Sequence, residues 1–211
     1  MKVAIVIPTY NDEENIGLIL DAISAEEKLI SDKVVVVIVD GNSKDKTSEI
    51  VKGRAILADN IYLINEKEKG GLGAAYVRGM KYSMETLHVD AIVEMDADFQ
   101  HDPKDIKRLI AKINEGYDYV IGSRYIRGGS IPKSWAFHRK FLSYAGNLFS
   151  RLVLFFPEIH DVTSGFRISR SNVLSKVNLD SLEEKAYTYK IQLLYEMKKR
   201  GARLSEIPIK F

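Results

Sequence analysis

Short apolar runs rich in β-branched residues recur along the chain. The first two, Val3–Ile7 and Val34–Val39, are continuously apolar and do not alternate with polar residues. A continuous run of this kind is typical of a strand that helices cover on both faces of a parallel sheet. Shorter runs follow at residues 61–64, 91–93 and 119–121, and a last candidate strand spans 203–209.

Segments with helical character lie between these runs. We expect helices over residues 12–25, 43–58, 72–86, 103–115 and 187–200. Strands that alternate with helices at this spacing predict βαβ units and an α/β sheet. Ligands bind such sheets beyond the carboxyl ends of the strands. The candidate loops are therefore PTYNDEEN after the first strand, DGNSKDKT after the second and DADFQHDP after the fourth.

Composition narrows the class of protein without identifying it. The 211 residues are 45% hydrophobic and 28% charged, which fits one ordinary globular domain. A formal net charge of +2 provides no global field suited to nucleic acid, so we expect no nucleic-acid partner. The chain has no cysteine, which excludes disulfides, thiolate metal sites and a cysteine nucleophile and fits a cytoplasmic setting. No stretch approaches the roughly 18 apolar residues of a membrane span.

The most acidic stretch, EMDADFQHDP, follows the fourth apolar run. If the chain stays extended after Glu94, alternation turns Asp96, Asp98 and Gln100 to one side. The opposite and packed side would then hold Met95, Ala97 and Phe99. Three converging oxygen ligands predict a site for a hard divalent cation, Mg²⁺ or Mn²⁺.

Helix capping is the alternative explanation for these acids. It accounts for Asp102, which precedes Pro103 at the first position of the next helix. It does not account for Asp96 or Asp98, because both lie too far upstream of that helix.

The loops after the first two strands offer groups that suit a nucleotide. Tyr10 presents a ring on which a base could stack, although such a ring also packs in a core. Asp40 could accept a hydrogen bond from a base or ribose, or it could close an Asx-type turn. The segment Gly70–Gly73 is not a dinucleotide motif, since it follows the third strand and has Tyr76 in place of the third glycine. No Walker loop is present, so a cation-held nucleoside diphosphate remains the best prediction.

The tract from Tyr119 to Pro157 contains no acidic residue. Its basic residues are Arg124, Arg127, Lys133, Arg139, Lys140 and Arg151. Apolar side chains within it recur at helical spacing, at Phe141, Ala145, Leu148, Phe149, Leu152 and Phe156. The other helix face would carry Arg139, Lys140, Ser143, Asn147 and Arg151. The pattern predicts a basic amphipathic helix whose apolar face contacts a lipid or membrane surface.

This tract also offers a second anion site. Arg124 follows the fifth strand at the same sheet edge, and its guanidinium can fork onto phosphate oxygens. Arg139 and Ser143 are four residues apart and share a helix face. An ordinary solvated charged face is the alternative.

Six motifs, taken in order, resemble glycosyltransferase family 2. They are PTYND, VDGNSKDKT, KGGLGAAYVRG, DADFQHDP, GSRY and TSGFR, and they are most similar to the branch of dolichol-phosphate mannose synthases and polyprenyl-phosphate glycosyltransferases. The resemblance implies a GT-A fold, with a Rossmann-like, mostly parallel sheet flanked by helices. It also implies a nucleotide-sugar donor and a Mg²⁺ or Mn²⁺ ion held by Asp96, Asp98 and Gln100.

The resemblance assigns further residues by motif. It implies donor contacts from Pro8, Tyr10, Asp12, Asp40, Asp96, Ala97 and Asp98. It places the acceptor phosphate near Arg124, Arg139 and Ser143, and it gives catalytic roles to Asp98 and Arg124. We accordingly expect one domain, 1–211, with a nucleotide-sugar and metal half at 1–122 and an acceptor half at 123–211.

The chain departs from the family pattern in three places. Asp12 stands where the family often has Glu, and Asp40-Gly41-Asn42-Ser43 stands where an Asp-rich sequence is usual. Relatives usually continue past the last strand into a basic lid, and many add membrane helices, so we expect lid and anchor to be absent from these 211 residues.

The expected reaction is inverting transfer of a hexose, mannose from GDP-mannose, to a polyprenyl or dolichyl phosphate. The enzyme would work peripherally at the cytoplasmic face of a membrane. Three alternatives stay open: a UDP-sugar donor, a sugar-hydroxyl acceptor, and a non-enzymatic nucleotide-sugar-binding module. A hydroxyl acceptor requires a general base, for which Asp161 and Glu183/Glu184 are the candidates.

Overall fold

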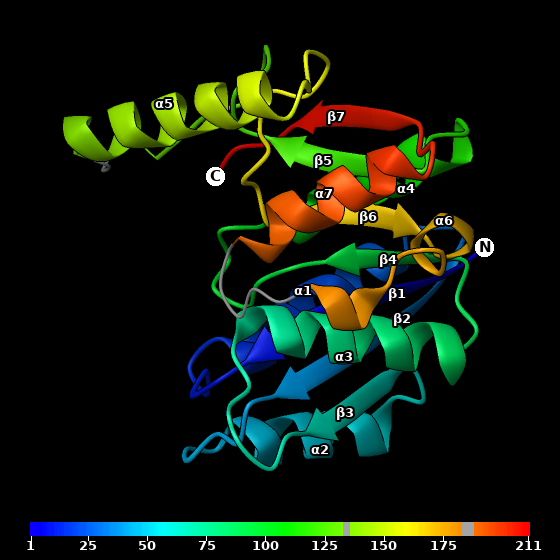
Figure 1. Ribbon diagram of the computed structural model, residues 1–211. Helices are drawn as coiled ribbons and strands as arrows, with labels where there is room; N and C mark the ends of the chain where they lie inside the picture. Colours follow the sequence, from blue (N-terminus) through cyan, green and yellow to red (C-terminus); the bar gives the residue numbers. More distant parts are fainter. Residues whose placement is uncertain (133–135, 183–187) are drawn as a thin grey trace.

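A seven-stranded, mostly parallel sheet forms the centre of the molecule in the computed structural model, which describes residues 1–132, 136–182 and 188–211 (Figure 1). The strands are β1 (Lys2–Thr9), β2 (Lys33–Asp40), β3 (Ile61–Asn65), β4 (Ala91–Glu94), β5 (Tyr119–Ser123), β6 (Arg167–Arg170) and β7 (Leu204–Pro208). Their order in the sheet is β3-β2-β1-β4-β6-β5-β7. All neighbours pair in parallel except β6, which is antiparallel to both β4 and β5.

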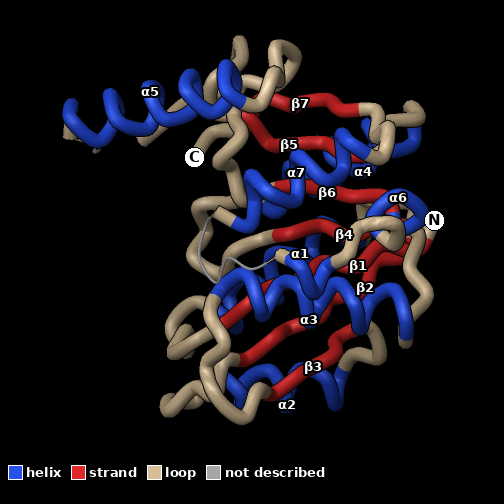
Figure 2. The backbone as a smooth tube through the Cα atoms, in the orientation of Figure 1, coloured by secondary structure: helices blue, strands red, loops and turns tan. Residues whose placement is uncertain are grey.

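Helices cover both faces of the sheet, as the continuous apolar strands predict (Figure 2). They are α1 (Ile16–Glu27), α2 (Thr47–Leu57), α3 (Leu72–Glu85), α4 (Ile106–Asn114), α5 (Phe137–Val153), α6 (Ser171–Leu174) and α7 (Tyr189–Lys199), with short 3₁₀ turns η1 (Pro103–Asp105) and η2 (Leu179–Ser181). Side chains of α1, α2 and α4 share one buried cluster with Val3, Ile5 and Ile7 of β1. Ala4 and Val6 point the other way, into the cluster formed with α3 and α7.

Strand β6 is absent from the sequence-based prediction. It is four residues long, and its sequence RISR carries two arginines. Arg167 and Ser169 are nevertheless buried. Ile168 is the one apolar side chain that β6 buries, which is too little for hydrophobic periodicity to detect a strand.

Helix α5 packs with its polar face toward the body and its apolar face toward solvent. Asn147 is 2% exposed, whereas Phe141, Phe149 and Leu152 are each more than 60% exposed. Phe156 departs from the predicted apolar face, because it lies beyond the end of α5 and is fully buried. Figure 1 shows α5 extending from the body beside the ends of β5 and β7. No helix within the described ranges is long and apolar enough to span a membrane.

The close approach of α3 to the sheet gives a stability prediction. A Cβ atom at Gly79 would lie 2.3 Å from Val6 Cγ1 and 3.1 Å from Val39 Cγ2. We expect Gly79→Ala to lower the free energy of unfolding by about 1–3 kcal/mol through overpacking, despite the better helix propensity of alanine. Urea denaturation measures the change. The matched control is Gly53→Ala in α2, where a Cβ meets nothing within 4 Å, and it should not destabilise the protein.

Candidate active site

A cavity of about 330 Å³ opens where β1 and β2 end. Its lining residues are Pro8, Thr9, Tyr10, Asp12, Gly41, Lys69, Gly71, Leu72 and Ala75. Tyr10 is 39% exposed, so its ring is not a core residue. The ammonium of Lys69 lies 3.5 Å from the centre of that ring. A carboxylate oxygen of Asp12 accepts from the backbone N–H of Tyr10 at 2.8 Å and holds this turn in shape.

Asp40 connects the chain segments around the cavity through hydrogen bonds. Its side chain is buried and accepts hydrogen bonds from the hydroxyls of Thr9, Ser43 and Ser48 at 2.6–3.1 Å. It also accepts a hydrogen bond from the backbone N–H of Ser43 at 3.0 Å. This bond fits the Asx-type turn that the sequence offered as the alternative role of Asp40. A direct contact between Asp40 and a nucleotide stays a prediction.

The acidic loop after β4 follows the expected alternation only as far as Asp98. Met95 and Ala97 are buried, and Asp98 is exposed. The prediction that Phe99 packs on the opposite side is wrong, because its φ of 58° turns the backbone and leaves the ring 43% exposed. This turn brings Gln100 back to Asp98, whose carboxylate accepts from the backbone N–H of Gln100 at 3.1 Å and from its Nε2 at 2.6 Å. Asp102 caps η1 as expected, accepting from Lys104 N at 3.0 Å.

Asp96 is partly buried among polar side chains from several elements. Its Oδ1 accepts from the hydroxyl of Tyr76 at 2.6 Å, and its Oδ2 lies 4.0 Å from the ammonium of Lys190. The ring of His101 accepts from the backbone N–H of Asp96 at 2.9 Å. Burial alone would raise the pKa of Asp96, but Lys190, His101 and the Tyr76 hydroxyl hold it below its ordinary value. Burial also lowers the pKa of His101 to about 4, so that its imidazole is neutral at physiological pH.

Asp98 has the opposite electrostatic setting. Partial burial raises its pKa, and the negative charges of Asp96 and Asp12 add to that effect against the hydrogen bond from Gln100. A cation relieves such mutual repulsion of carboxylates. Among the described residues no three His, Cys, Asp or Glu side chains cluster as a metal site. Asp96, Asp98 and Gln100 nevertheless fit Mg²⁺ or Mn²⁺, which commonly binds proteins through one or two carboxylates and leaves positions for substrate phosphates.

Arg124 lies at the same sheet edge, as predicted, but it is buried and paired. Its Nε and Nη2 donate to the two oxygens of Asp161 at 2.7 and 2.8 Å. Nη2 also donates to Thr163 Oγ1 at 2.9 Å, and the ring of Phe211 lies 5.0 Å from the guanidinium carbon. The expected fork onto a phosphate is therefore formed with a carboxylate in this structure. Contact of Arg124 with an acceptor phosphate stays a prediction.

The polar face of α5 connects to this pair. Asn147 Nδ2 donates to Thr163 Oγ1 at 3.2 Å, and Val162 N donates to Asn147 Oδ1 at 2.9 Å. The hydroxyl of Ser143 hydrogen-bonds that of Tyr125 at 2.6 Å. Arg139 belongs to α5, but its side chain lies outside the described part of the structure, as do Glu183 and Glu184.

Several site residues escaped the sequence-based prediction. Lys69 stands in the KGG motif, but only the fold shows that its ammonium covers Tyr10. The sequence drew attention to Tyr76 only because it stands where a dinucleotide motif would have its third glycine. In the structure its hydroxyl donates a hydrogen bond to Asp96. Nothing in the local sequence points to Lys190, because α7 brings it to Asp96 from 94 residues away along the chain.

The family model and the named relatives that match this chain all describe glycosyltransferases or a mannose synthase. The family model "Glycosyl transferase family 2" matches residues 4–177. Polyprenol monophosphomannose synthase of Mycolicibacterium smegmatis is 34% identical over 211 residues, which are 100% of this chain and 77% of that protein. Undecaprenyl-phosphate mannosyltransferase of Micrococcus luteus is 34% identical, with 100% and 84% covered. Dolichol-phosphate mannosyltransferase of Pyrococcus furiosus is also 34% identical, but this chain spans 56% of its length.

Solved structures share the fold at low sequence identity. Mannosyl-3-phosphoglycerate synthase from Rubrobacter xylanophilus matches with a TM-score of 0.71 and 16% identity, covering 100% of this chain and 66% of that one. Glucosyl-3-phosphoglycerate synthase from Mycobacterium tuberculosis was solved with Mn²⁺, uridine diphosphate and phosphoglyceric acid. It matches with a TM-score of 0.69 and 20% identity, and the match covers 99% of this chain and 68% of that one. The fold is thus the expected GT-A fold. From the family model and the 34% identity over its whole length, the chain belongs to glycosyltransferase family 2.

Proposed function

We propose that this chain transfers mannose from GDP-mannose to the phosphate of a polyprenyl or dolichyl phosphate, with inversion at the anomeric carbon and with the help of Mg²⁺ or Mn²⁺. The single observation that carries the proposal is the placement of a nucleotide-sized cavity beside a pair of self-repelling carboxylates at one sheet edge. Helix α3 joins the two, since Leu72 and Ala75 line the cavity and the adjacent Tyr76 binds Asp96. The names of three relatives support this donor sugar and this acceptor. Two are called mannosyltransferases of undecaprenyl or dolichol phosphate, and the third is called a polyprenol monophosphomannose synthase.

The cavity supports the donor assignment through its chemistry. The exposed ring of Tyr10 offers a stacking surface for the base once the ammonium of Lys69 moves aside. That ammonium then has the diphosphate as a new partner of opposite charge. Pro8, Asp12 and Gly41 border the same space.

The carboxylates supply the place for a metal ion. Asp96, Asp98 and Gln100 would hold it, and the ion would neutralise charge that grows on the departing nucleoside diphosphate. Tyr76 keeps Asp96 in one orientation through its hydrogen bond to Oδ1. Asp98, which reaches solvent, is free of that constraint and can turn toward the diphosphate.

A phosphate acceptor needs no general base. One of its oxygens forms the new bond to the anomeric carbon while the bond from that carbon to the diphosphate breaks, and a phosphomonoester is already an anion at neutral pH. Arg124 stands at the same edge and would bind and orient this anion. The hydroxyl-acceptor alternative would use Asp161 as base, but that carboxylate is fully buried and both of its oxygens bind Arg124.

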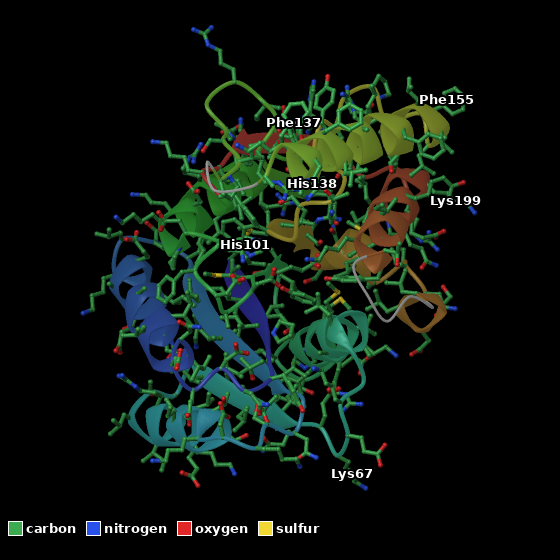
Figure 3. All side chains as sticks on the ribbon, turned by 90° about the vertical axis from the view of Figure 1, so that its left-hand side faces the viewer. Lys67, His101, Phe137, His138, Phe155 and Lys199 are labelled. Atoms are coloured by element: carbon green, nitrogen blue, oxygen red, sulfur yellow. The ribbon has the colours of Figure 1, made fainter. Side chains whose placement is uncertain are left out.

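Helix α5 supports a lipid acceptor. Its outer face exposes large apolar side chains from end to end, from Phe137 at 83% to Phe155, just after the helix, at 81% (Figure 3). The acid-free tract around it carries only positive charge, which suits an anionic membrane surface. We propose that this face rests on the membrane that holds the acceptor, so that the enzyme acts peripherally at its cytoplasmic side.

The first test concerns the donor and the metal. With Mn²⁺, GDP-mannose and polyprenyl phosphate, the chain should form a mannosyl lipid, and Asp98→Ala should lower the rate about 100-fold or more, because a charge-neutralising ligand is lost. Thermal shifts with GDP-mannose, UDP-glucose and UDP-N-acetylglucosamine, with and without Mn²⁺, identify the donor.

The matched control for this test is Asp59→Ala, an exposed acid in the turn after α2. Its activity should equal that of the wild type. Unchanged metal-dependent donor binding in Asp98→Ala would refute the assignment of this carboxylate, and a larger shift with a UDP-sugar would replace the donor.

The second test concerns α5. Phe149→Glu should weaken binding to phosphatidylcholine–phosphatidylglycerol vesicles by about tenfold, because it places a charge on the apolar face. Its free energy of unfolding should change by less than about 0.5 kcal/mol, since the ring is 68% exposed. Ile56→Glu, at an 84% exposed apolar site in α2, is the control and should bind vesicles normally. A dimer in solution with no vesicle binding would show that a second copy covers the helix.

The third test concerns Asp161. Asp161 is the partner of the buried Arg124, and removing its charge leaves that arginine uncompensated. Asp161→Asn should therefore lower the free energy of unfolding, measured in urea, by about 3–5 kcal/mol. Arg124→Met/Asp161→Asn should lose less than the sum of the two single changes, because neither charge is then left alone. A variant of full stability that lacks only turnover would instead support a base at this position.

A further inference from the structure

Lys190 is a buried lysine in the first turn of α7, with no exposed side-chain surface. It does not line the cavity at β1 and β2. A buried ammonium is costly unless a charge of opposite sign compensates it. Asp96 supplies such a charge, because its Oδ2 lies 4.0 Å from Lys190 Nζ, and the buried carboxylate of Glu94 adds to it.

The surrounding side chains fix the position of Lys190 from three sides. Arg167, fully buried in β6, donates from Nη1 to the backbone oxygen of Lys190 at 2.5 Å. The neighbouring Tyr189 donates to Glu94 Oε2 at 2.5 Å, which ties the start of α7 to β4. The ring of Tyr76 lies 5.6 Å from the ammonium, while its hydroxyl binds the other oxygen of Asp96. Asp96 is therefore held between a phenol on one oxygen and an ammonium near the other.

A glycine leaves room for this arrangement. A Cβ atom at Gly165, in the TSGFR motif, would lie 2.2 Å from Lys190 Nζ and 3.2 Å from Asp96 Oδ2. Any larger residue there would push the ammonium from the carboxylate. Phe166, the next residue, stacks on His101 at 4.9 Å between ring centres, and His101 accepts from the backbone of Asp96. Figure 3 shows His101 well inside the molecule.

We propose that Lys190, given space by Gly165, is a positioning residue that serves as an internal counter-ion for Asp96 and weakens binding of a divalent cation in the absence of the donor. The inference rests on the proposed function, in which Asp96 shares a metal ion with Asp98. It adds a lysine that does not line the proposed donor cavity, and a role for the glycine of the TSGFR motif.

The physical reason is repulsion between two cations that share one carboxylate. A divalent ion on Asp96 meets the positive charge of Lys190 a few ångström beyond it. The diphosphate of the donor brings negative oxygens that offset this repulsion, so the metal is retained with the nucleotide and released with it. Without metal, the same ammonium partly offsets the negative charge of Asp96 and Glu94.

The test measures binding of Mn²⁺ alone to the full chain, from the loss of the free-ion signal in electron paramagnetic resonance. Lys190→Met should bind Mn²⁺ at least about tenfold more tightly than the wild type, because unit charges a few ångström apart near a protein surface interact by several times RT. Mn²⁺ should also raise the Tm of this variant more than that of the wild type. Lys199→Met, on the exposed outer side of α7, is the matched control and should behave as wild type (Figure 3).

A second variant separates charge from packing and is available if Lys190→Met does not fold. Gly165→Ala keeps the lysine but displaces its ammonium, so it should also tighten Mn²⁺ binding, though by less. In the Lys190→Met background the same glycine change should add nothing, since no ammonium remains to be moved. Gly53→Ala controls for adding a methyl group elsewhere.

Unchanged or weaker Mn²⁺ binding in both Lys190→Met and Gly165→Ala overturns the inference. Additive effects of the two changes overturn the role of Gly165. These outcomes are distinct from failure of the proposed function, which would appear as no thermal shift of the wild type with any nucleotide sugar plus Mn²⁺. A wild type that binds no donor while its variants still gain Mn²⁺ affinity would refute the function and leave the counter-ion in place.

Discussion

The join between β4 and β6 is the constraint on which the rest of the molecule depends. Here the sheet changes from parallel to antiparallel, with Glu94 directly paired to Arg167 in register. Both side chains are fully buried, together with Lys190. Burial raises the pKa of Glu94, and the positive charges of Arg167 and Lys190 oppose that rise. Two fully buried cations and the fully buried carboxylate of Glu94 thus stand close together, with the partly exposed carboxylate of Asp96 beside Lys190. Breaking this set would leave an uncompensated charge in the core.

This polar join connects the two halves of the chain. Arg167 also donates to the carbonyls of Val162 and Ser164, so one guanidinium organises the loop that carries Gly165. Tyr189 and Lys190 bring α7 onto β4 at the point where the acidic loop begins. The position of the candidate metal ligands is therefore determined as much by Arg167, Tyr189 and Lys190 as by the acidic loop itself.

Much of the fold could be predicted because apolar runs such as Val34–Val39 report burial on both faces of a strand. Helix and strand boundaries differed by a few residues, since loops such as the one before Ile16 carry helix-forming residues that turn instead. Strand β6 could not be predicted, because two of its three buried positions are polar and the partners of Arg167 are distant in sequence. The same reason hid Lys190 and the pairing of Arg124 with Asp161, whereas the acidic loop and the basic tract were visible as local charge. Phe99 was misplaced because a single left-handed residue ends an alternation that the sequence pattern continues.

The ammonium of Lys69 above the ring of Tyr10 has a kinetic consequence for the proposed reaction. A base that stacks on Tyr10 must first displace this side chain, and after transfer the same side chain can return to the ring. Lys69 then competes with the base, but not with the sugar, for the ring of Tyr10. Because it belongs to the same chain, its effective concentration at the ring is high. In the proposed reaction such a competitor would shorten the residence time of the spent nucleotide, so the surface proposed to bind the donor would also promote release of the product.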